Sequence, residues 1–128
     1  MTKAKLPRLQ TSHLAEPIRR AMKAARMRPV AKACHRNASS IVMQGEVTLF
    51  YVEGIVDVGG SLIAHAWVRD EHGTDHEVTL DPSRGPVVIV EVVAVLDAAA
   101  VAARVLRDGT FALGADVHAA EERLRRAR

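Results

Sequence analysis

Two stretches of alternating side chains, separated by turn residues, constrain the fold of this chain more than any other feature. In residues 61–70, SLIAHAWVRD, every second side chain faces the same way, as in a strand with one face on a core. Residues 76–81, HEVTLD, alternate again after the turn signal EHGTD. A preceding strand is predicted over 47–56, VTLFYVEGIV, and the turn residues DVGG follow it. Together these segments predict an antiparallel meander that can pack one face on a helix.

Helical patterns flank this meander on both sides. The predicted helices cover residues 12–27, 30–43, 97–109 and 117–128, and a further strand is expected at 85–93. We therefore predict an α+β domain in which N-terminal helices carrying the single cysteine pack on a small antiparallel sheet, with helices at the C-terminal end.

The composition indicates a globular protein outside the membrane. Aromatic residues make up only 3% of the 128 residues, so the core has to be built from Val, Ala, Leu and Ile. The longest apolar stretch is interrupted by Glu91 and Asp97, which predicts that it does not cross a bilayer. The N-terminal residues contain no apolar signal-peptide region, and one cysteine allows no internal disulfide bond. A cytoplasmic location is expected, and the oligomeric state is left open.

The charge of the chain is divided unevenly along its length. Residues 1–36 contain ten Lys and Arg against one acid, whereas residues 37–128 contain eight Lys and Arg against fourteen acids. We predict a basic helical N-terminal extension over 1–28 and one domain over 29–128. A solvated basic face and a binding surface for nucleic acid are both compatible with this segment, although it contains no aromatic residues for base stacking.

The single cysteine, Cys34, lies in the polar stretch ACHRNAS near the predicted start of the second helix. A reactive thiol needs a group that stabilises its thiolate, a histidine that carries the proton, and a third group that orients the histidine. A helix would supply Cys34, the strand 61–70 would supply His65, and the end of the next strand would supply Asp81 on the same face. A small buried cysteine is the alternative for Cys34 taken alone, and a turn-initiating aspartate is the alternative for Asp81.

Three short motifs in this order resemble the transglutaminase-like branch of the papain-like cysteine hydrolases. They are Tyr51-Val52-Glu53-Gly54, His65-Ala66-Trp67 and Asp81-Pro82-Ser83, preceded by Cys34 on a helix. The resemblance covers residues 33–84.

The resemblance implies a Cys34–His65–Asp81 triad that attacks a peptide or protein carboxamide and passes through a thioester. Hydrolysis and acyl transfer both remain open, and neither a metal nor a cofactor is expected. Asn37, Trp67 and Glu53 are predicted to support the site or contact the substrate. The alternative function is a non-catalytic binding protein that uses its basic N-terminal segment.

Overall fold

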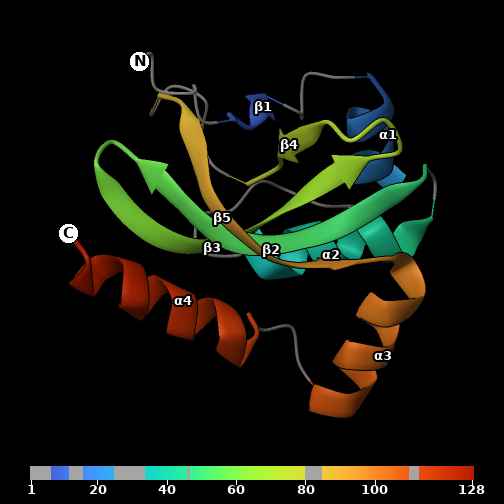
Figure 1. The fold of residues 1–128 in the computed structure, drawn as a ribbon. Helices are drawn as coiled ribbons and strands as arrows, with labels where there is room; N and C mark the ends of the chain where they lie inside the picture. Colours follow the sequence, from blue (N-terminus) through green and yellow to red (C-terminus); the bar gives the residue numbers. More distant parts are fainter. Residues whose placement is uncertain (1–6, 12–15, 25–33, 46, 80–84, 110–112) are drawn as a thin grey trace.

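The computed structural model describes residues 7–11, 16–24, 34–45, 47–79, 85–109 and 113–128. Its elements are β1 (Gln10–Thr11), α1 (Glu16–Ala24), α2 (Cys34–Gln44), β2 (Leu49–Val58), β3 (Ser61–Asp70), β4 (Asp75–Glu77), β5 (Val87–Leu96), α3 (Ala98–Asp108) and α4 (Ala115–Arg126). The predicted α+β class is confirmed: helices that include the cysteine-bearing α2 pack on a mainly antiparallel sheet (Figure 1).

The β2–β3 hairpin forms the centre of the sheet. It pairs ten residues with ten, from Leu49 opposite Asp70 to Val58 opposite Ser61. Gly59 and Gly60 form its turn with φ values of 59° and 91°, a left-handed conformation that glycine adopts without a Cβ clash. The Asp57 carboxylate accepts a hydrogen bond from the Gly60 N–H at 2.8 Å and closes the turn. The hairpin therefore lies where the alternation and the DVGG signal predicted it.

Two helices cover one face of this hairpin. Ala66 and Val68 of β3 pack in one core cluster with α2, while Leu62 packs with Val117 and Ala120 of α4 in another. Because alternate residues of a strand share a face, α2 and α4 lie over the same side of the sheet, one beside the other along its length (Figure 1).

The opposite face is enclosed by the curvature of the sheet. The strand order is β1-β4-β3-β2-β5, and residues 7–9 also pair with the start of β5 through two backbone hydrogen bonds of 2.8 and 2.9 Å. The segment that leads into β1 thus joins the two ends of the sheet. Trp67 fills the enclosed space with a second apolar cluster, and its ring lies so close to Gly54 that a Cβ there would come within 2.8 Å of it. Glycine is needed at this position for space.

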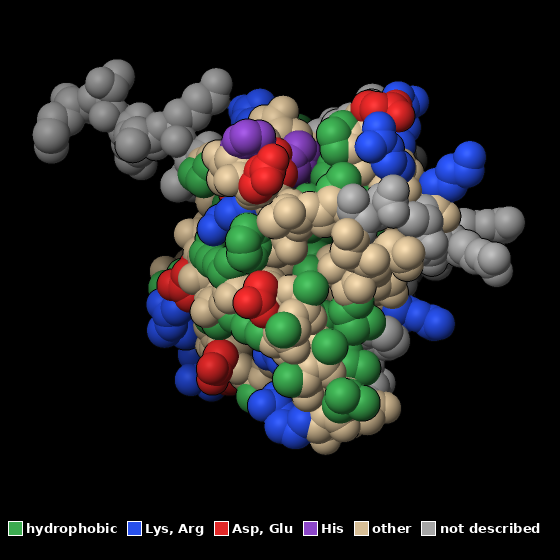
Figure 2. Space-filling model, turned by 90° about the vertical axis from the view of Figure 1, so that its right-hand side faces the viewer, with side chains coloured by type: hydrophobic (Ala, Val, Ile, Leu, Met, Phe, Trp, Pro, Cys, Tyr) green, Lys and Arg blue, Asp and Glu red, His purple; other side chains and the backbone are tan. Residues whose placement is uncertain are grey.

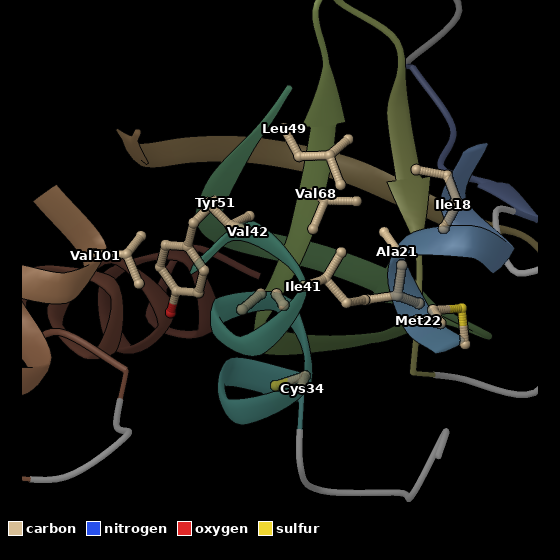
Figure 3. Packing of buried hydrophobic residues seen from close by; sticks show 13 residues of the cluster. Ile18, Ala21, Met22, Cys34, Ile41, Val42, Leu49, Tyr51, Val68 and Val101 are labelled. Atoms are coloured by element: carbon tan, nitrogen blue, oxygen red, sulfur yellow. The ribbon is translucent and has the colours of Figure 1, made fainter. Parts of the chain in front are cut away.

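The core extends into the segment that was expected to form a separate extension over residues 1–28. Ile18, Ala21 and Met22 of α1 are buried in the same cluster as Ile41 of α2 (Figure 3). Leu9 is buried in the cluster on the opposite face. The helix α1 is therefore a layer of this domain, because its apolar side follows the helical period that packs against α2. In the part of the chain that the structure describes, no helix is long and apolar enough to cross a membrane.

We expect Ile18→Ala to destabilise the whole domain by about 2–4 kcal/mol, because it leaves a cavity where a side chain is 2% exposed. Urea unfolding followed by circular dichroism measures this change. The matched control is Lys23→Ala on the exposed side of α1, for which we expect less than about 0.5 kcal/mol. Equal stability of both variants would mean that α1 is peripheral.

Candidate active site

Cys34 is the first residue of α2 and forms one end of its core cluster (Figure 3). Its side chain is buried, with 8% of the residue exposed. The N–H groups of a first helical turn have no partner within the helix and carry a partial positive charge, so they favour an anion at this position. The His35 N–H donates to the Cys34 sulfur, and the Ala66 N–H of β3 does the same.

His65 lies between the thiol and a buried carboxylate. Its Nε2 is 2.6 Å from Glu77 Oε2, and both side chains are almost completely buried. The Cys34 thiol is the other side chain that acts on His65, and each of the two groups shifts the pKa of the other. Since Nε2 faces Glu77, the Nδ1 atom is the one left for the sulfur. The structure therefore brings together a thiol, an imidazole and a carboxylate in this order.

The pKa values of the Cys34 thiol and the His65 imidazole are shifted in opposite directions. Burial alone would raise the pKa of the Cys34 thiol, but the hydrogen bond and charge of His65 and the two backbone N–H groups outweigh it and lower that pKa. Burial would likewise lower the pKa of His65, yet its contacts with Cys34 and Glu77 raise it to about 9. The two shifts in opposite directions favour a thiolate paired with an imidazolium.

The carboxylate partner of His65 is Glu77, whereas the sequence predicted Asp81. Asp81 lies outside the described residues, so its contacts stay a prediction. The register of β3 and β4 pairs Val68 with His76, and extending it places Glu77 opposite Trp67, diagonal to His65 on one face. Pairing the residues outward from the turn at 71–74 would have placed Glu77 near His65 from the sequence alone, because a tight hairpin fixes which residues face each other.

Asn37 forms a structural hydrogen bond at the site, which was one of its predicted roles. Its Nδ2 donates to Thr79 Oγ1 at 3.2 Å, and both residues are buried. The Thr79 N–H in turn donates to Glu77 Oε1 at 2.7 Å. Sequence reasoning missed Thr79, although it lies two residues from Glu77 and shares its alternation.

Trp67 packs beside the imidazole from two residues further along β3. The His65 and Trp67 rings are stacked, with centroids 6.2 Å apart and an interplanar angle of 25°. The indole Nε1 donates to Asp75 Oδ1 at 2.9 Å, and Arg69 Nε donates to the same oxygen at 2.9 Å. The indole is therefore fixed by a charged partner and restricts how far the imidazole can tilt.

Glu53 lies on the helix-covered face and links the sheet to α3 and α4. Its Oε1 is 2.8 Å from Arg104 Nη1, and its Oε2 accepts from the Tyr51 hydroxyl at 2.6 Å and from the Gly114 N–H at 3.1 Å. Burial and the Glu53 hydrogen bond raise the pKa of Tyr51 above its usual range. These contacts tie the sheet to α3 and to the start of α4, and the predicted role of Glu53 at the site stays a prediction.

Two of the basic side chains that the structure describes near the N-terminus form ion pairs on α1. Arg19 and Arg20 lie within 4.0 Å of Glu16 on the exposed side of α1. Figure 2 shows Lys and Arg side chains interspersed with Asp and Glu on one face. Among the described residues, no group of three or more His, Cys, Asp or Glu side chains is arranged to hold a metal ion.

A scan against models of known protein families found no match to this chain, and neither did searches of curated proteins and of solved structures.

Proposed function

We propose that this protein is a thiol-dependent amide hydrolase or acyltransferase that acts on a peptide or protein carboxamide. Cys34 is the nucleophile, His65 transfers the proton, and Glu77 orients His65. The observation that carries the proposal is the buried contact chain from Cys34 through His65 to Glu77, with 2.6 Å between His65 Nε2 and Glu77 Oε2.

The chemistry follows from the resting ion pair. The Cys34 thiolate attacks the carboxamide carbon and forms a tetrahedral intermediate. The His65 imidazolium then gives its proton to the departing amine, and the C–N bond breaks to leave a thioester on Cys34. Neutral His65 next takes a proton from water or from an acceptor amine as that molecule attacks the thioester. The product acid or amide leaves, and the thiolate–imidazolium pair is restored.

Glu77 contributes by charge and geometry. Its carboxylate stabilises the imidazolium and holds Nε2, so that Nδ1 faces the sulfur through the cycle. The Cys34 backbone N–H at the start of α2 is a candidate oxyanion donor, because the first turn of a helix leaves such groups free of intrahelical bonds.

We expect the wild-type protein to release one equivalent of nitrophenolate from p-nitrophenyl acetate in a burst and to gain one acetyl group on Cys34. Mass spectrometry of the intact protein and of its peptides identifies the thioester. Adding a lysine-containing peptide as acceptor distinguishes transfer, which gives the N-acetylated peptide, from hydrolysis, which gives acetate. Cys34→Ser is expected to show no burst, and a burst of wild-type size in that variant would exclude the proposal.

A further inference from the structure

A closed ring of contacts starts and ends at Cys34. Asn37 lies three residues after Cys34 on α2, and its amide donates to Thr79 Oγ1 at 3.2 Å. The Thr79 N–H donates to Glu77 Oε1 at 2.7 Å, and Glu77 Oε2 contacts His65 at 2.6 Å. His65 completes the ring through its interaction with the Cys34 thiol, which shifts the pKa of both groups. The helix α2 is thus linked to the Glu77 carboxylate in two ways, through His65 and through the Asn37–Thr79 hydrogen bond.

We propose that Asn37 and Thr79 are positioning residues that set the separation between the Cys34 thiolate and the His65 imidazolium. This inference rests on the proposed function, since it assigns a task at the same site. Neither residue touches the thiol in the contacts described, so each acts through a neighbour.

The local backbone explains why a side-chain tie is useful here. The strand β4 ends at Glu77, two residues before Thr79, so strand pairing no longer defines the path of the chain there. Val78 is fully buried in the core cluster with α2 and anchors this segment from one side. The Asn37–Thr79 hydrogen bond adds a polar link between this segment and the same helix. Both partners are buried, with 6% and 4% of each residue exposed, and losing one leaves the other without its bond.

The backbone contact of Thr79 also fixes the rotation of the carboxylate. With Oε1 of Glu77 held by the Thr79 N–H, Oε2 is directed to His65. A shift of the segment by 1 Å would tilt the carboxylate and the imidazole together, and misplacements of this size cost up to roughly 100-fold in reactivity.

The test compares Thr79→Val with Thr79→Ser in the full chain. Valine keeps the branched shape and the backbone N–H but removes the acceptor oxygen, whereas serine keeps the oxygen. The rate of Cys34 alkylation by iodoacetamide is measured against pH. We expect Thr79→Val and Asn37→Ala each to move the profile upward by about one pH unit, about tenfold in rate at pH 6. Thr79→Ser and the helix control Ser40→Ala should stay close to wild type.

The double variant of Asn37→Ala and Thr79→Val should be no slower than either single variant, because both remove one shared bond. If wild type itself reacts like an ordinary thiol, the proposed function fails. If wild type reacts at low pH but both single variants keep its profile, only the positioning role is overturned, even where the variants unfold more readily. If Thr79→Val does not fold, the alkylation profile of Asn37→Ala is compared with that of Ser40→Ala instead. An upward shift in Asn37→Ala alone supports the positioning role, and equal profiles overturn it.

Discussion

His65→Ala is expected to slow alkylation of Cys34 at pH 6 by about 100-fold, because the profile returns to that of an ordinary thiol with a pKa of about 8.5. The reason is the loss of the hydrogen bond and charge that lower the Cys34 pKa against the opposing effect of burial. Stopped-flow alkylation over a range of pH, with the thiolate absorbance as a second readout, measures the change. Wild type should react well below pH 8.

The neighbouring histidine supplies the matched control. His35 follows Cys34 on the helix, where adjacent side chains point about 100° apart, so His35→Ala should leave the profile unchanged. Equal profiles for wild type and His65→Ala, or an inert Cys34 in the folded protein, would contradict the pairing and leave the cysteine with a packing role.

The raised pKa of His65 also fixes the direction of the pH dependence of stability. The folded state holds this proton up to about pH 9, whereas the unfolded histidine releases it near 6.5. The contribution of this proton to the free energy of unfolding is therefore fully present below about pH 6.5 and is lost as the pH rises through about 9. For Cys34 the lowered pKa acts in the opposite sense: its contribution is present above the unfolded thiol pKa and is lost as pH falls through the folded value.

Local patterns in the sequence were sufficient for most of the architecture. The alternation in 61–70 gave β3 with its observed bounds, because a half-buried strand repeats every two residues. Asp97 caps α3 by accepting from the Ala100 N–H, and Gly109 ends it in the left-handed conformation, both as the residue types predict. The closure of the sheet by residues 7–9 had no such signal, since it depends on pairing between segments about 80 residues apart.

The candidate site was predictable in its strand positions and less so in its third member. Cys34 and His65 followed from the helix start and the strand alternation, and the structure joins them. The third group depended on where β4 stops. Three residues form that strand, against six expected, because the chain leaves the ladder after Glu77. Periodicity continues through VTLD, so the pattern alone could not show where pairing ends.

Glu77→Gln should therefore have a far larger effect than Asp81→Asn. Glutamine keeps the size of the side chain and an oxygen for Nε2, but it removes the charge that stabilises the imidazolium. We expect the pKa of His65 to fall from about 9 toward its ordinary 6.5, which lowers the imidazolium fraction at pH 7 from almost all molecules to about one quarter, roughly fourfold. Nuclear magnetic resonance titration of the imidazole and the alkylation profile report this loss independently. Asp81→Asn is expected to change neither. A shift in the Asp81 variant with none in Glu77→Gln would show that the carboxylate acting on His65 in solution is Asp81, as the sequence motif implied, and would remove Glu77 from the mechanism.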